Sequence, residues 1–320
     1  MAPARSRARP AGRAVRRTFR PPHRRGSFAG VTIPHPAGTD TAPRPRDEDL
    51  DFFGVTHQGL VRKDNQDHFL YSTLHKSMRV RGTSLPNPEL LEIPGQRLAS
   101  FGLVADGVGG RAGGEAASRV ATEALALYVT HAMESFYSED PADEANFLRS
   151  LTDAAGRAHE AVLHKARQEG QEKPPATTMT AIIAIWPRVY ILHVGDSRFY
   201  RYRSGRVEQI TRDQTMAQDL VDAGALPAER ATASPFSRIL SSSLGGETTR
   251  PVVSTADLRP GDVLLLCTDG LTKHVSDDRI AERLGHLTSS EAAARGLVDD
   301  ALAGGGSDNV TVVVMRAIVR

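Results

Sequence analysis

The chain is long enough, at 320 residues with 40% hydrophobic content, to bury one large core or two small ones. No apolar run approaches the roughly 18–20 residues of a membrane-spanning helix, and none follows Arg16-Arg17, so we expect neither a transmembrane segment nor a secretory signal. The single cysteine, Cys267, excludes an internal disulfide framework and favours a reducing, cytoplasmic setting.

The first 46 residues form a strongly basic segment. They contain eleven arginines, no lysine and one acid, Asp40, and so carry about +10, whereas the whole chain carries +2. Residues 47–320 therefore carry about −8. Because the segment is rich in Pro, Ala and Gly and lacks apolar periodicity, we predict a disordered Arg/Pro-rich tail. It is either a solvated tail or a basic arm for an anionic partner such as nucleic acid, a membrane or an acidic protein.

From about residue 50 to residue 320 the pattern predicts one domain. Apolar runs of strand length alternate with segments of helical periodicity, and Ser204-Gly205 is typical of a hairpin turn. In chain order, the expected elements are strand Leu98–Ala105, helices Glu115–Met133 and Glu144–Glu169, strands Met179–Trp186, Val189–Val194, Tyr200–Tyr202 and Val207–Ile210, helix Thr215–Ala223, strand Val263–Cys267, helices Ser276–Leu284 and Ser290–Leu302, and strand Val310–Met315. Clustered strands with helices inserted in pairs favour an α+β domain with largely antiparallel sheets.

Two stretches read as loop insertions. Lys76–Arg97 contains three prolines, and Pro227–Thr249 is rich in Ser, Ala and Gly. Loops of this length are usually lids, binding flaps or disordered segments.

Aspartates recur where apolar strands meet glycine or another small polar residue. Strands run into Asp106-Gly107, Asp196-Ser197 and Asp269-Gly270, Asp308 precedes the last strand, and Asp67 opens the run Phe69–Tyr71. Strand ends can direct several short carboxylates into one cleft, where their mutual repulsion is relieved by cations. All-oxygen ligation selects hard ions such as Mg²⁺ or Mn²⁺. A single Asp-Gly is more often a turn, but five such aspartates indicate a metal centre.

The motifs that contain these aspartates resemble, in order and spacing, the metal-dependent protein phosphatases, the type 2C serine/threonine phosphatases and particularly their bacterial members. The resemblance runs from about Val55 to the C-terminus. Its blocks are Gly59-x-x-Arg62-x-x-Asn65-Gln66-Asp67, Ala105-Asp106-Gly107-Val108-Gly109-Gly110, Gly114-Glu115-x-Ala117-Ser118, Ala176-Thr177-Thr178, Val194-Gly195-Asp196-Ser197-Arg198, Ile210-Thr211-x-Asp213, Thr268-Asp269-Gly270-Leu271 and Asp308-Asn309-Val310-Thr311.

The resemblance implies a four-layer αββα sandwich, with two packed, mainly antiparallel sheets flanked by pairs of helices. It also implies a phosphatase that hydrolyses phosphoserine and phosphothreonine with a metal-activated water at a two-metal Mn²⁺ or Mg²⁺ centre, acting on phosphoproteins and reversing a cognate kinase in signalling. The catalytic domain would span residues 50–320, with a flap at about 219–249.

The resemblance also assigns roles to single residues. Asp106 and the carbonyl of Gly107 would bind the pair of ions, with Asp106 bridging both. Asp269 and Asp308 would complete one metal shell, and Asp67 would act through metal-bound waters. Asp196, with Asp269, matches a position that can hold a third, weaker ion. Arg62 matches the residue that grips the substrate phosphate, and its planar fork suits phosphate oxygens.

Three positions depart from the family pattern. Val108 stands where many eukaryotic members have a histidine that acts as general acid, so the leaving group must take its proton from water or from another residue. Gln214-Thr215 replaces the more usual His-Ser, and Ala176 replaces a glycine. Cys267 and His193 are interpreted as buried structural residues.

Two alternatives are open, and the first differs in class from an active phosphatase. One is an inactive phosphatase-like binding module, but such modules lose metal aspartates, which are all present here. The other is an active domain whose basic tail makes it chiefly a tethered regulator.

Overall fold

The computed structural model describes residues 43–78, 93–109, 113–132 and 141–318, and these residues belong to one compact unit. Most of the predicted basic tail and the centre of the predicted Lys76–Arg97 insertion lie outside the described residues.

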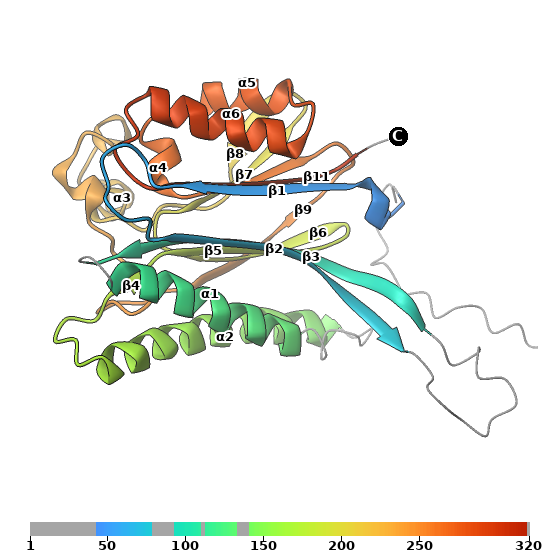
Figure 1. Ribbon diagram of the computed structural model, residues 1–320, viewed down its shortest axis with the longest axis horizontal. Helices are drawn as coiled ribbons and strands as arrows, with labels where there is room; N and C mark the ends of the chain where they lie inside the picture. Colours follow the sequence, from blue (N-terminus) through green and yellow to red (C-terminus); the bar gives the residue numbers. More distant parts are fainter. Residues whose placement is uncertain (1–42, 79–92, 110–112, 133–140, 319–320) are drawn as a thin grey trace, which may run out of the picture. The chain divides into compact units, whose positions relative to one another are not determined.

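Two antiparallel sheets occupy the middle of this unit (Figure 1). The first has the strand order β1-β11-β10-β7-β8 and the second β2-β3-β5-β6-β9, with the short β4 paired to β3. The strands are β1 (Leu50–His57), β2 (Asp67–Met78), β3 (Ile93–Val108), β4 (Ala176–Thr177), β5 (Met179–Ile185), β6 (Arg188–Val194), β7 (Arg198–Arg203), β8 (Arg206–Gln209), β9 (Val252–Asp257), β10 (Val263–Cys267) and β11 (Val310–Ala317). The prediction of mainly antiparallel sheets is confirmed.

Helices cover the outer face of each sheet, which gives the four layers visible in Figure 1. The second sheet packs against α1 (Gly113–Ala132) and α2 (Pro141–Gln168), and the first against α5 (Asp277–Gly285) and α6 (Ser290–Ala303). A third apolar cluster, which includes Val104, Ile191, Leu266 and Val313, lies between the two sheets. The expected αββα sandwich is therefore confirmed.

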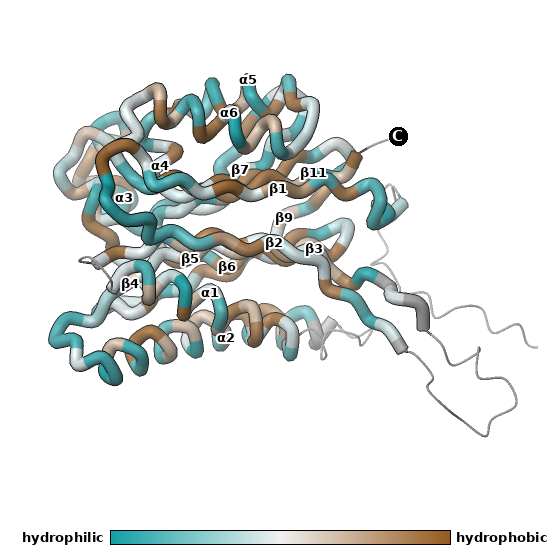
Figure 2. The backbone as a smooth tube through the Cα atoms, viewed as in Figure 1, coloured by the Kyte–Doolittle hydropathy of each residue, from teal (hydrophilic) through white to brown (hydrophobic). Residues whose placement is uncertain are grey.

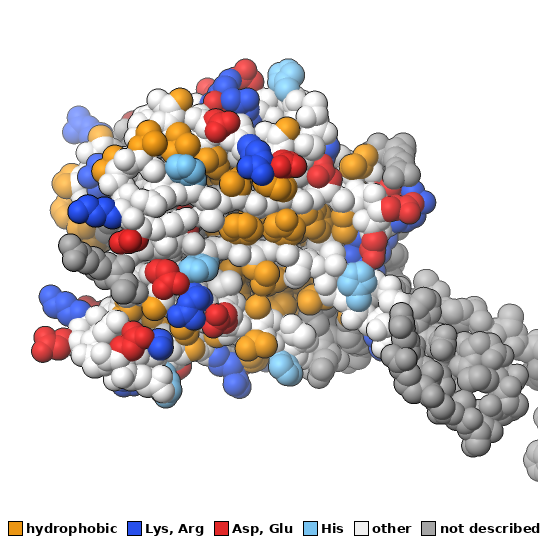
Figure 3. All heavy atoms as spheres, viewed as in Figure 1, with side chains coloured by type: hydrophobic (Ala, Val, Ile, Leu, Met, Phe, Trp, Pro, Cys, Tyr) orange, Lys and Arg blue, Asp and Glu red, His pale blue; other side chains and the backbone are white. Residues whose placement is uncertain are grey.

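The pattern of hydropathy explains why these elements form. Strands of both sheets carry brown segments in Figure 2, and the helices carry both brown and teal residues. Every side chain of the central strand β10 is buried, because both faces of this sheet are covered. In the space-filling view of Figure 3, apolar side chains gather in bands between the layers, while charged side chains lie mainly over the helices.

Local signals set several boundaries. Ser204 and Gly205 both have positive φ, 50° and 84°, as a two-residue type I′ hairpin turn requires, and they join β7 to β8 as predicted. Ser276 and Ser289 cap α5 and α6 with their side-chain oxygens, which fixes where these helices begin. Thr215 likewise caps α3 (Met216–Asp222), so it lies just outside that helix.

Four strands differ from the sequence prediction. β1 was not predicted, and neither was β9, an edge strand that is largely exposed and so carries little apolar signal. The predicted insertion Lys76–Arg97 is wrong at both ends, because β2 continues to Met78 and β3 begins at Ile93. Strand pairing between these two long strands overrides the turn-like composition of their ends.

The predicted flap region contains short 3₁₀ turns at Ala228–Arg230 and Pro235–Arg238. Its first residues belong to α3. Met216 N, at the start of that helix, donates to Ile239 O at 2.8 Å, and Leu244 N donates to Thr177 O of β4 at 2.9 Å. None of the helices in the described residues has the length and apolar character needed to cross a membrane.

Candidate metal centre

Five aspartates from both sheets come together at one end of the strands. Asp67 begins β2 and lies directly opposite Asp106 on β3, so their Cβ atoms are about 5 Å apart. Asp196 follows β6, and Asp269 follows β10 as the first residue of the short helix α4 (Asp269–Thr272). Asp308 precedes β11. After burial, the other four carboxylates each raise the pKa of Asp106, so the five aspartates interact electrostatically as one cluster.

Asp67 reaches across from the second sheet to the first. Its Oδ2 accepts hydrogen bonds from Thr268 Oγ1 at 2.8 Å and Thr311 Oγ1 at 2.7 Å. Thr311 Oγ1 also lies 2.8 Å from Thr56 Oγ1, which accepts a hydrogen bond from Asn65 Nδ2 at 2.8 Å. Because Thr311 donates to Asp67, the Thr56 hydroxyl donates to Thr311. The other oxygen, Oδ1, is buried and has no hydrogen-bond partner. One oxygen of Asp67 is thus fixed by the protein, and the second is left for a ligand.

Asp269 shows the same division. Its Oδ2 lies 2.6 Å from Lys273 Nζ, and its Oδ1 is buried with no hydrogen-bond partner. Gly270 allows this placement, since a Cβ there would lie 1.9 Å from the carbonyl oxygen of Asn309. A glycine is therefore required for the turn after β10 to approach the turn before β11.

Asp308 is held by two cationic side chains. Arg62 donates from Nη2 to Asp308 Oδ2 at 2.8 Å, and its Nε lies 2.7 Å from Oδ1. Lys273 Nζ also donates to Oδ2 at 2.7 Å. The fork of Arg62 that would bind a phosphate therefore contacts a carboxylate in this structure.

Asp106 and Gly107 are positioned by the paired threonines of the Ala176-Thr177-Thr178 motif. Thr178 Oγ1 accepts from Asp106 N at 3.0 Å, and Thr177 Oγ1 donates to Asp106 O at 2.8 Å. Gly107 is buried, and a Cβ there would lie 2.2 Å from the carbonyl oxygen of Gly114. The close approach explains why glycine follows Asp106.

Asp196 follows a turn residue, Gly195, that has to be glycine. Gly195 has φ of 103°, and a Cβ there would collide with Thr178. Gln214 secures the turn, because its Oε1 accepts from Gly195 N at 2.8 Å while its Nε2 donates to Arg250 O at 2.9 Å. The departure at position 214 therefore contacts the residue next to a predicted ligand.

The protonation of these carboxylates reflects burial without enough positive charge. Burial, followed by the neighbouring aspartates, raises the pKa of Asp106 well above its usual range. Burial raises the pKa of Asp67 to about 7 and that of Asp196 to about 8. Asp308 is the exception: hydrogen bonds from Lys273 and Arg62 outweigh its burial and lower its pKa.

The donor set fits hard divalent cations. Within the described ranges, no three His, Cys, Asp or Glu side chains already form a group that could hold a metal ion, and the nearest positive charges to Asp269 and Asp308 are Lys273 and Arg62. The buried Oδ1 atoms of Asp67 and Asp269 nevertheless lack partners, and buried carboxylate oxygens of this kind need either a proton or a cation. Mg²⁺ or Mn²⁺ would satisfy them.

Several residues of the site were not identified from the sequence. Thr268 and Thr311 orient Asp67, and Asn309 fixes the loop that carries Arg62 by donating to Gln58 O and Asp64 O at 2.8 and 2.9 Å. All three lie inside the recognised motifs, next to aspartates or at a strand end, and that position is the signal that could have revealed them. Lys273 had no such signal beyond its i+4 spacing from Asp269.

Other sequence predictions concern residues outside the centre. Cys267 is fully buried in β10, and burial raises its pKa to about 12, so it is no nucleophile. His193 is buried between Thr180 Oγ1 and the carbonyl of Arg212, and burial lowers its pKa to about 4. Val108 is 44% exposed and supplies no proton donor.

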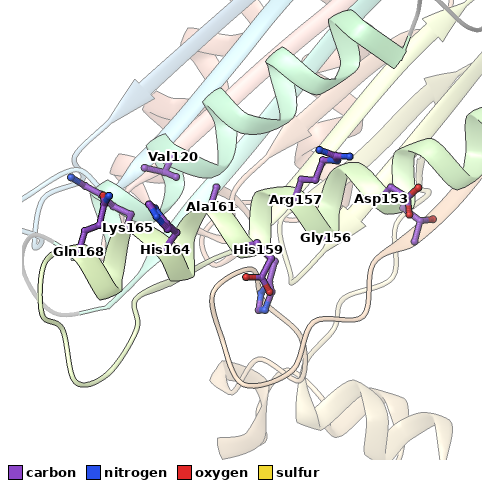
Figure 4. A pocket seen from close by; sticks show the side chains of 11 residues that line it. Val120, Asp153, Gly156, Arg157, His159, Ala161, His164, Lys165 and Gln168 are labelled. Carbon is purple, nitrogen blue, oxygen red and sulfur yellow. The ribbon is translucent and has the colours of Figure 1, made fainter.

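An open hollow of about 1030 Å³ follows α2 and is a different feature (Figure 4). Its lining includes Val120 of α1 and, on α2, Arg157, His159 and His164. His159 accepts from Gly245 N at 2.9 Å, so it supports the C-terminal part of the predicted flap region. None of the five aspartates lines this hollow.

Comparison with known proteins gives consistent matches. The family model for protein phosphatase 2C matches residues 93–304. The serine/threonine protein phosphatase PstP of Mycobacterium tuberculosis is 37% identical over 238 residues, which are 74% of this chain. The chain spans only 44% of the length of that relative.

Solved structures agree with the sequence matches. The crystal structure of the M. tuberculosis phosphatase PstP/Ppp has a TM-score of 0.66 and 32% identity over 84% of this chain and 99% of that one. A structure of the PstP catalytic domain in complex with two manganese ions has a TM-score of 0.63, also with 32% identity, over 84% of this chain and 99% of that one.

Proposed function

Because the chain belongs to the protein phosphatase 2C family, we propose that it is a metal-dependent serine/threonine protein phosphatase. The observation that carries the proposal is the state of two aspartates from opposite sheets. Asp67 and Asp269 each have one oxygen held by the protein and a second that is buried without a hydrogen-bond partner. A domain that kept these oxygens for packing alone would leave their desolvation uncompensated.

In this proposal, Asp106, the carbonyl of Gly107, Asp269 and Asp308 hold two Mn²⁺ or Mg²⁺ ions, and Asp67 supports them, in part through water. The relative of known structure binds two manganese ions in its catalytic domain, which supports the same count here. When bound, such ions supply a lowered pKa for water and neutralise charge on the phosphate oxygens. Asp196 lies at the margin of the centre and is not needed for two ions.

Arg62 binds the substrate phosphate in this scheme. Its side chain is 54% exposed, and its fork already contacts a carboxylate, Asp308, with the geometry that suits a phosphate. When Asp308 serves as a metal ligand, Arg62 is free to turn toward a phosphate. Its loop stays in place because Asn309 holds the backbone on both sides of it.

The leaving group obtains its proton from water. Val108 carries no ionisable group at the position where a general acid would stand, and Cys267 and His193 are buried away from solvent. These three residues therefore supply no proton to the leaving group.

Phosphoproteins are the proposed substrates, with a serine/threonine kinase as the opposing enzyme, in the cytoplasm.

The basic tail would contact an anionic partner. Arg46 pairs with Asp49 at 3.0 Å, and Arg44 donates to Leu98 O at 3.0 Å. Deletion of residues 1–42 therefore leaves these contacts intact. Lost targeting with unchanged peptide turnover in that truncation would favour a tethered enzyme.

The deciding experiment measures hydrolysis of phosphoserine, phosphothreonine and phosphotyrosine peptides by the full chain with Mn²⁺, with Mg²⁺ and with a chelator. We expect metal-dependent turnover of the first two peptides and its loss in Asp269→Asn. Binding of phosphopeptides without turnover would favour an inactive binding module instead. Near-normal turnover in Asp269→Asn would contradict the metal assignment.

A further inference from the structure

Lys273 places a fixed positive charge inside the carboxylate cluster. Its Nζ lies 2.6 Å from Asp269 Oδ2 and 2.7 Å from Asp308 Oδ2. Its backbone N–H donates to the carbonyl of Asp269 at 2.9 Å, so one helical turn sets the distance between the lysine and this aspartate. The ammonium thus bridges residues that belong to two different strand ends, after β10 and before β11.

The charge of Lys273 also reaches Asp196, on the turn after β6. After burial, the neighbouring Asp269 carboxylate raises the pKa of Asp196, and the Lys273 ammonium lowers it. A positive charge at the position of Lys273 would therefore act on Asp196, Asp269 and Asp308, which belong to three different loops.

A count of charge shows what the lysine does. The five aspartates carry five negative charges when ionised, and two divalent ions neutralise four of them. The fifth is neutralised by Lys273, whereas Arg62 is needed by the substrate in the proposed function. Arg62 is 54% exposed and sits on a loop, but Lys273 is 33% exposed and tied to α4. The arginine can leave the cluster more easily than the lysine.

We propose that Lys273 is a resident counter-cation that fills the position beside Asp196, Asp269 and Asp308 that a further divalent ion would otherwise take, so that this centre holds two divalent ions and not three. The proposal rests on the proposed function, since it concerns the ions of that centre. It makes Lys273 a residue that sets metal stoichiometry, and it makes Asp196 a ligand only when the lysine charge is removed.

The test counts bound ions directly. Mn²⁺ binding to the full chain is measured by equilibrium dialysis and titration calorimetry for the wild type, Lys273→Met and Lys273→Arg. Methionine is an unbranched side chain one atom shorter than lysine and removes the charge, and arginine keeps the charge. Lys165→Met is the matched control, because Lys165 is 38% exposed, pairs with a glutamate four residues away and lies on α2.

We expect two Mn²⁺ per chain in the wild type, in Lys273→Arg and in Lys165→Met, and one additional Mn²⁺ in Lys273→Met. The double variant Lys273→Met with Asp196→Asn should return to two. An unchanged count in Lys273→Met would overturn the proposal, as would a third ion in the wild type.

Two further arms keep the test decisive. If Lys273→Met does not fold, as judged by circular dichroism, Lys273→Gln replaces it. Asp196→Asn alone should leave the count at two, and loss of an ion in that variant would contradict the proposal without any change at Lys273. A wild type that binds no Mn²⁺ would instead reject the proposed function.

Discussion

Two clusters of charged residues in this molecule use aspartate in opposite ways. On the helical layer, Asp300 of α6 accepts four hydrogen bonds of 2.7–3.0 Å from Arg279 and Arg283 of α5. In the candidate metal centre, Asp67 and Asp269 each leave one buried oxygen without a hydrogen-bond partner. The side chains of the protein satisfy both oxygens of Asp300, whereas the buried oxygens of Asp67 and Asp269 need a bound cation or a proton.

The protonation of the two clusters follows the same division. Hydrogen bonds from Arg283 and Arg279 hold the pKa of Asp300 well below its usual range, while burial raises the pKa values of Asp67, Asp106 and Asp196. A carboxylate with a lowered pKa stabilises the fold, and one with a raised pKa destabilises it where it is ionised. Unpaired burial of this kind makes the aspartate cluster a candidate functional site.

The largest effect is expected from Asp106→Asn. Loss of this proposed metal ligand should reduce turnover by about 10³-fold or more, which corresponds to several kcal/mol of lost charge stabilisation. The same change should raise the thermal unfolding midpoint in a chelator, because it removes a buried charge that repels its neighbours. Calorimetry without metal and a peptide assay with Mn²⁺ check the two halves. A lower midpoint would show that Asp106 is a structural residue like Asp300.

A smaller loss is expected from Arg62→Ala. Hydrogen bonds to a charged group contribute about 1.5–3 kcal/mol, so kcat/KM should fall about 10–100-fold. Arg62→Lys keeps the charge but loses the fork, and it should be intermediate. Mn²⁺ affinity should not fall in either variant, because Arg62 holds no metal. An unchanged kcat/KM would remove Arg62 from the substrate site.

Thr311→Val tests the orientation of Asp67. It removes the 2.7 Å hydrogen bond to Asp67 Oδ2 but keeps the shape of the side chain. Loss of such a supporting contact typically weakens metal affinity about 10–100-fold, and Thr311→Ser should restore it. Mn²⁺ titration provides the measurement. Equal affinity in the valine variant would mean that Thr268 alone orients the carboxylate.

The smallest effect is expected from Asp300→Asn, which should leave turnover unchanged. Because the pKa of Asp300 is lower in the folded chain than in the unfolded chain, its stabilisation is present above the unfolded value of about 4 and is lost as the pH falls through the folded pKa. Denaturant unfolding of the variant should show a stability deficit at pH 6 that shrinks below about pH 4. A deficit that grows on acidification would contradict this sign.

In a chelator, the pH dependence of stability that comes from Asp67 should have the opposite sign. The free energy of unfolding should fall as the pH rises from about 4 to 7.

The sequence predicted the elements whose signal is local. β10 has the predicted bounds, and the turn at Ser204-Gly205 has the positive φ values that its residues favour. β1 and β9 were missed because their side chains are only partly buried, so neither alternation nor a continuous apolar run marks them. The family resemblance supplied the sandwich, which local periodicity could not.

The amino-acid sequence by itself determined that five aspartates stand at strand ends beside small residues, and from this came the expectation of a metal centre. Only the tertiary structure decided which oxygen of each aspartate is fixed. Thr311 lies 244 residues from Asp67, and Arg62 lies 246 from Asp308. Such contacts form because antiparallel pairing brings distant strand ends together, and no local pattern encodes them. For the same reason Lys273, an ordinary helix-end lysine in the sequence, lies within the carboxylate cluster of the folded chain.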